Sequence, residues 1–87
     1  MTDKKLPKNT ANLQRIWAAK KQESGLTQTQ VAKKLGWTQS AFSQYLNNHV
    51  ALNPAAILKL GAVLDVHPAD IDPEMFNLIK AYQGEEK

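Results

Sequence analysis

The chain has 87 residues, of which 43% are hydrophobic, and its formal net charge at pH 7 is +3. A chain of this length forms one small domain, since it buries only roughly 60–65% of its unfolded surface and has no material for a second core. The absence of cysteine excludes a disulfide framework and a thiolate metal site, and it suits the cytoplasm. No apolar run approaches the ~20 residues of a membrane span, so no membrane partner is expected.

The charge is divided unevenly along the chain. In residues 1–50, eight cations face two anions, whereas in residues 51–87 three cations face six anions. A basic first half is typical of a surface that docks on a polyanion, although a merely solvated face is the simpler alternative. The acidic second half indicates a different task.

The first segment, residues 1–8, is polar and basic and contains a proline, which predicts a flexible arm. A helix is predicted to follow Asn9 or Thr10 and to end at Gly25. One face of this helix carries residues at the helical spacing of three, four and seven, namely Leu13, Ile16, Trp17 and Lys20.

Two Thr-Gln pairs mark the starts of the next two helices. Thr27 can cap the first of them, and Gln30, three residues later, can complete a capping box. Gly36 offers the left-handed conformation that ends a helix. The sequence therefore predicts a helix over residues 28–35.

The second pair repeats the signal, with Thr38 as the cap of a helix over about residues 39–47. Two helices joined across a short turn that contains glycine form a helix-turn-helix. The positions that such a unit must fill with apolar or small residues hold Val31, Ala32, Leu35, Trp37, Phe42 and Tyr45.

The second half of the chain predicts further helices and no strand. Asn53-Pro54 starts a helix that runs to about Leu64, since proline is welcome at the first helical position. His67-Pro68 opens one short turn, and Asp72-Pro73 starts a last helix over about residues 73–83. Residues 84–87 are predicted to be a tail or the start of a linker. The expected fold is all-α with five helices, in one domain over residues 9–83.

Four polar, uncharged side chains are predicted to point outward from the first turns of the second helix of the pair: Gln39, Ser40, Ser43 and Gln44. In a helix-turn-helix this helix lies in the major groove with its N-terminal residues at base edges. Glutamine can bind adenine in bidentate fashion, and serine can approach most bases. The free N–H groups at the start of the first helix, near Gln28, favour a phosphate. In an arbitrary helical pair the same side chains would simply face solvent.

Residues 13–82 resemble the DNA-binding domains of lambdoid phage repressors, the Cro/CI-type helix-turn-helix family. The resemblance rests on Leu26-Thr27-Gln28, Val31-Ala32, Gly36, Gln39-Ser40, Asn47, Ala51-Leu52-Asn53 and Asp72-Pro73 in register.

The resemblance implies that Gln39 reads an adenine, that Ser40 contacts a guanine, and that Gln28 holds a phosphate and braces Gln39. The contacts that it implies with the DNA backbone come from Gln28, Thr38, Asn47, Asn53, Lys4 and Lys5. The chain departs from the family at Asn48, which replaces a usual glycine, and at Val50, which replaces a groove-facing asparagine. Ser43 and Gln44 replace small residues, which implies a different operator sequence.

The last predicted helix carries more apolar surface than a short terminal helix can hide within one core. The apolar residues are Met75, Phe76, Leu78, Ile79 and Tyr82. By resemblance, this helix pairs with its twin in a two-fold homodimer, which places two recognition helices roughly 34 Å apart. The alternative is that the stripe closes the core of the monomer.

These observations predict a sequence-specific regulator that binds duplex DNA, a phage or prophage-type repressor in the cytoplasm of a bacterium or a phage-infected cell. No catalytic arrangement, cofactor site or metal site is expected; His67 has no partner at ligand spacing and is predicted to be a turn residue or cap. The alternative is a helix-turn-helix antitoxin or adaptor that acts mainly through protein–protein contacts.

Overall fold

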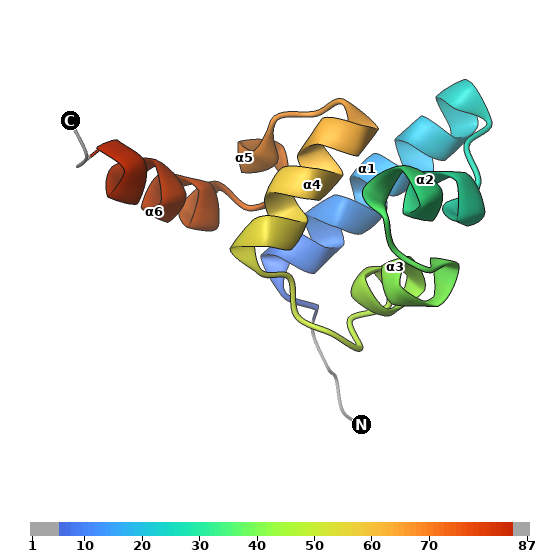
Figure 1. Cartoon of the computed structure of the whole chain (residues 1–87), viewed down its shortest axis with the longest axis horizontal. Helices are drawn as coiled ribbons and strands as arrows, with labels where there is room; N and C mark the ends of the chain where they lie inside the picture. The colour runs from blue at the N-terminus through green and yellow to red at the C-terminus, as the bar shows by residue number, and fades with distance from the viewer. Residues whose placement is uncertain (1–5, 85–87) are drawn as a thin grey trace.

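The computed structural model describes the backbone of residues 6–84 and side chains as far as Ala81. Over these residues the chain forms helices without strands, so the predicted all-α class is confirmed. The helices, drawn in Figure 1, are α1 (Lys8–Ser24), α2 (Gln28–Leu35), α3 (Gln39–Leu46), α4 (Pro54–Leu64), α5 (Pro68–Ile71) and α6 (Pro73–Gly84).

Helices α2, α3 and α4 begin at side-chain caps that the sequence predicts. The Thr27 hydroxyl accepts a hydrogen bond from the Gln30 N–H, and the Gln30 side chain accepts one from the Thr27 N–H, so the capping box is complete. Thr38 caps α3 through the Ala41 N–H, and Asn53 caps α4 through the Ala56 N–H. The repeated Thr-Gln pair therefore has one local role in common, which is to fix a helix start.

Three boundaries differ from the sequence prediction. The helix α1 begins at Lys8, inside the predicted arm, because the Pro7 carbonyl accepts from the Ala11 N–H and no side-chain cap is needed. Residues 68–71 form a short helix where the sequence predicts one turn, so residues 6–84 contain six helices instead of five. Gly84 belongs to α6 and not to the predicted tail. The predicted histidine cap is confirmed, since His67 Nδ1 accepts from the Ala69 N–H.

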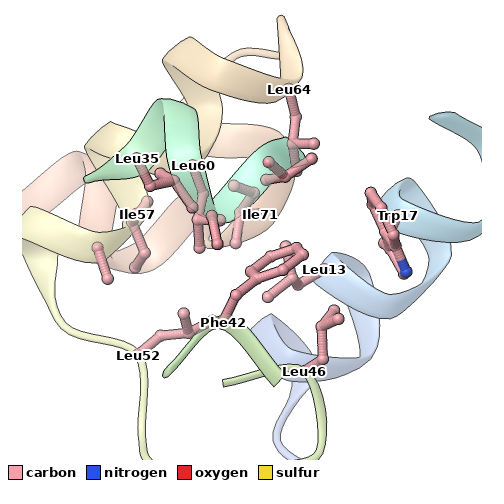
Figure 2. Close-up of a cluster of buried hydrophobic side chains, with 13 residues drawn as sticks. Leu13, Trp17, Leu35, Phe42, Leu46, Leu52, Ile57, Leu60, Leu64 and Ile71 are labelled. Carbon is pink, nitrogen blue, oxygen red and sulfur yellow. The ribbon is translucent and has the colours of Figure 1, made fainter. Parts of the chain in front are cut away.

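A single apolar core joins the first five helices. Its largest fully buried side chains include Phe42, Leu13 and Ile57, which come from α3, α1 and α4. Figure 2 shows Phe42 beside Leu13, with the side chains of α4 and Ile71 of α5 above them. The Trp17 ring packs edge-on against Phe42, with 5.3 Å between ring centroids. Burial of these side chains from four helices holds the helix-turn-helix against α1 and α4.

The elements are arranged with α2 and α3 at one side of the molecule and α6 at the other (Figure 1). Gly36 turns the chain between α2 and α3 with φ +80°, a conformation that glycine adopts without strain. Asn48 also has a positive φ, of 61°, so it adopts the left-handed conformation that its side chain tolerates. The helix α6 packs against α5 and α4 and leads away from the core.

Candidate nucleic-acid interface

The N-terminal end of α3 is open to solvent. Gln39 and Ser40, the first two residues of the helix, are exposed, and so is Gln44 in its second turn. Ser43 is half-buried, and its hydroxyl accepts a hydrogen bond from Nδ2 of Asn47, the residue that follows α3. The structure thus leaves the amide and hydroxyl groups at the start of α3 uncovered by the part of the chain that it describes.

The two glutamines of the Thr-Gln pairs meet across the turn. The Nε2 atom of Gln39 donates a hydrogen bond of 2.7 Å to the Oε1 atom of Gln28. Gln28 is half-buried and Gln39 is exposed, so the bond lies at the surface where α2 and α3 converge. Since each glutamine is the first residue of its helix, two helix N-termini are linked through one pair of amides.

This bond leaves a defined set of hydrogen-bonding groups free in each amide. Gln39 keeps its Oε1 acceptor and one N–H of Nε2, whereas Gln28 keeps the two N–H groups of its own Nε2. Gln39 therefore offers one acceptor beside one donor, and Gln28 offers donors. An acceptor beside a donor matches the major-groove edge of adenine, and donors match a phosphate.

The N-termini of α2 and α3 both favour negative charge. Neither helix has an acidic residue in its first turn, so no side chain competes with an anion for the N–H groups there. The Thr38 hydroxyl accepts from the Ala41 N–H, which leaves its own proton free to donate. Thr38 is exposed and lies at the N-terminus of α3, next to Gln39.

Two exposed asparagines flank the loop after α3. Asn47 Nδ2 donates to the Ser43 hydroxyl at 3.1 Å, and Asn53 Oδ1 accepts from the Ala56 N–H. Each side chain retains at least one N–H that could reach a phosphate. Val50 is exposed in the same loop, where an apolar side chain cannot donate to a base edge.

One residue that positions α3 was not found from the sequence. Gln14 of α1 donates from Nε2 to the backbone carbonyl of Leu46, the last residue of α3, over 2.6 Å. Carbonyls in the last turn of a helix lack an intrahelical partner, so this bond satisfies one of them and ties α3 to α1. The two residues are 32 positions apart, and no local pattern reports such a contact.

The basic first half of the chain also contains lysines that could contribute to the candidate interface. Lys4 and Lys5 lie outside the residues that the structure describes. Lys33 and Lys34 of α2 are exposed and line a groove of about 300 Å³ with Leu26 and Gln30.

In the described part of the chain, no group of three histidine, cysteine or acidic side chains could hold a metal ion.

The apolar residues of α6 are not equally exposed. Leu78 is 68% exposed, the highest value among the exposed large hydrophobic side chains that the structure describes. Met75 is half-buried and packs against the core, and Phe76 packs edge-on against the His67 ring at 4.7 Å between centroids. Ile79 is half-buried as well, and the Tyr82 side chain lies outside the description. The first turn of α6 is therefore anchored, while Leu78 has no cover within the described chain.

Comparison with known proteins agrees with this geometry. A family model described as helix-turn-helix matches residues 18–71, which include the C-terminal part of α1 from residue 18 onward and all of α2 to α5. The match stops before Asp72, so α6 lies outside it. No curated protein matches the chain closely enough to count as a relative. None of the helices in the described residues is long and apolar enough to cross a membrane.

Proposed function

Because the chain belongs to the Cro/CI-type helix-turn-helix family, whose domains bind DNA and regulate transcription, we propose that it is a repressor of the phage or prophage type. It binds a pseudo-palindromic operator as a homodimer, with α3 in the major groove. The observation that carries this proposal is the hydrogen bond from Gln39 to Gln28 at the open end of the helix pair.

In this proposal Gln28 and Gln39 have different roles. The Nε2 group of Gln28 donates to a phosphate and fixes the register of the protein on the duplex. The Gln39 amide, held by Gln28, presents Oε1 to the N6 amino group of adenine and the second N–H of Nε2 to N7. The orientation of the reading amide is thus set before DNA arrives, which lowers the ordering cost of binding.

The other contacts follow from the positions of the side chains around this pair. Ser40, Ser43 and Gln44 face bases farther along the groove, while Thr38, Asn47 and Asn53 donate to phosphates. Lys4 and Lys5 add contacts with the DNA backbone from the N-terminal arm. The net charge of +3 and the cationic first half of the chain raise the association rate with DNA and make affinity fall with salt.

The homodimer forms through α6. The exposed Leu78 packs against Leu78 of the second copy across a two-fold axis, together with Ile79 and Tyr82. Met75 and Phe76, which also pack against their own chain, lie at the edge of this interface. A two-fold pair of recognition helices matches an operator whose half-sites are one helical turn apart, about 34 Å.

Selection of binding sites from random duplex DNA tests the proposal, because it reports specificity, symmetry and half-site spacing together. Gln39→Ala is expected to cost about 1–3 kcal/mol on the selected operator and to leave binding to random duplex almost unchanged. Gln22→Ala, which removes an exposed glutamine from α1, is the matched control and should bind as the original chain does. Equal losses on both kinds of DNA would remove the reading role of Gln39.

Sedimentation equilibrium tests the dimer. Leu78→Glu should shift the protein toward monomer without unfolding it, since the leucine is mostly exposed. Asn77→Glu adds the same charge to the neighbouring exposed position and serves as the control. A dimer that survives Leu78→Glu, or a chain that binds an unrelated protein and shows no salt-dependent DNA affinity, would favour an adaptor or antitoxin instead.

A further inference from the structure

The junction between α5 and α6 is one residue long. Asp72 separates Ile71, the last residue of α5, from Pro73, the first of α6. Its backbone is extended, with φ −146° and ψ 90°, in the region that a following proline favours. The direction in which α6 leaves the body therefore depends on the interactions that hold Asp72 and the residues beside it.

The start of α1 supplies these interactions. One carboxylate oxygen of Asp72 accepts from the Met75 N–H at 2.9 Å, which caps α6, and the other accepts from Asn9 Nδ2 at 2.9 Å. One turn along α1, Asn12 Nδ2 donates to the Ile71 carbonyl at 3.0 Å. Ile71 and Asp72, the two residues before α6, are thus both hydrogen-bonded to side chains of α1. The Asp72 carboxylate binds α1 and caps α6 at the same time.

We propose that the bond between Asn9 and Asp72 is a brace that sets the direction of α6 relative to the recognition helix, and thereby the half-site spacing that the dimer accepts. The second part rests on the proposed function, in which two chains pair through α6. Asn9 and Asp72 act here as positioning residues, because they reach the operator only through the dimer geometry.

A small change in the direction of α6 at this junction produces a large displacement at the C-terminal end of the helix. The helix has 12 residues and is therefore about 18 Å long. A tilt of ~10° at Asp72 moves its end by about 3 Å, close to the 3.4 Å between successive base pairs on one strand. In a two-fold dimer both copies tilt, so the separation of the recognition helices changes by roughly one to two base pairs.

The brace can be broken without releasing α6. Met75 still packs against the core, and the Phe76 ring still packs against His67. These contacts hold the first turn of α6 to the body but lie close to the pivot, where they restrain its direction weakly. Variants of the brace should therefore stay folded and differ in the angle or angular spread of α6.

Double electron–electron resonance between two spin labels measures this angle directly. The chain has no cysteine, so Ala19→Cys in α1 and Ala81→Cys in α6 give two exposed and unique labelling positions. Labelled chains are mixed into a large excess of unlabelled chains, which confines the signal to pairs within one chain. The distance distribution should be narrow for the otherwise unchanged protein.

A set of variants first breaks the bond between Asn9 and Asp72 and then restores it with the amide and the carboxylate exchanged. Asn9→Ala should broaden or shift the label distance, and Asn9→Asp should do so more strongly, because it places two carboxylates together. Adding Asp72→Asn to Asn9→Asp should restore the distribution, since the new amide can donate to the new carboxylate and still cap Met75 through its oxygen. Asn77→Ala, an exposed asparagine of α6, is the control.

The same variants are then tested for half-site spacing on operators that carry one base pair more or fewer between the half-sites. Asn9→Ala should weaken the preference for the best spacing by about 2- to 10-fold, the range expected from loss of one hydrogen bond. The double variant should recover the preference. Label distances that do not change in Asn9→Ala and Asn9→Asp would overturn the brace, and an unchanged spacing preference would overturn its effect on the operator. Failure of the original chain to bind a two-fold site would defeat the proposed function alone, since the label distances still decide the brace.

Discussion

The hydrogen bond between Gln28 and Gln39 predicts an energetic coupling that a double-mutant cycle can measure. Gln28→Ala removes a proposed phosphate donor and also frees the Gln39 amide, which is exposed and makes no other side-chain hydrogen bond within the described residues. The net value of a hydrogen bond between neutral groups is about 0.5–1.5 kcal/mol. The free protein should lose less than about 0.5 kcal/mol of stability, because both amides can turn to water.

On the selected operator the effects should not add. Gln39→Ala removes the contact with the base. In that background, Gln28→Ala removes only the phosphate contact of Gln28, because no Gln39 amide remains to be oriented. The expected coupling is about 1 kcal/mol, or roughly fivefold in Kd. When the adenine under Gln39 is replaced by another base, the coupling should shrink toward zero, since no bidentate contact remains to be oriented.

Fluorescence anisotropy with labelled duplexes, at several salt concentrations, measures the four Kd values of the cycle. Glutamine carries no charge, so the slope of log Kd against log salt should be the same for all four proteins. Additive losses, within about 0.3 kcal/mol, would show that Gln28 does not orient Gln39. A changed salt slope would show instead that the variants alter the docking of the cationic residues.

Other substitutions test the local structure. Thr27→Ala should lower the free energy of unfolding by about 0.5–2 kcal/mol in urea denaturation without lowering operator affinity, whereas Thr38→Ala should lower both, since only Thr38 is proposed to touch DNA. Asp65→Gly should raise the melting temperature, because Asp65 has φ 60° and carries a negative charge at the C-terminal end of α4; an unchanged or lower value would contradict this reasoning. Gly61→Ala should destabilise the fold by about 1–3 kcal/mol, because the new methyl would lie 3.0 Å from the Val66 carbonyl oxygen, and calorimetry can detect a loss of that size.

The helix starts could be predicted from the sequence because capping is a local interaction. Thr27 and Gln30 are three residues apart, and so are Asn53 and Ala56, so each signal is complete within a short window. The start of α1 was predicted less well, since the Pro7 carbonyl leaves no side-chain signature.

The candidate interface was predicted in part. The outward direction of Gln39 follows from helical periodicity once its neighbours are assigned to the core, and exposure of the side chain agrees with it. The contact between Gln14 and the Leu46 carbonyl could not be predicted, because it requires the crossing of α1 and α3.

The sequence by itself determined the starts and caps of α2, α3 and α4, the turn at Gly36 and the division into a basic and an acidic half, since each depends on the residues themselves or on neighbours within a few positions. Only the tertiary structure decided which surfaces those helices share. The bond between Asn9 and Asp72 spans 63 positions, and it exists because the packed core brings the start of α1 to the start of α6. Burial of apolar surface drives that packing but has no preferred direction. Polar contacts such as the bond between Asn9 and Asp72 are directional, and in our proposal they set the angle of α6 on which operator spacing depends.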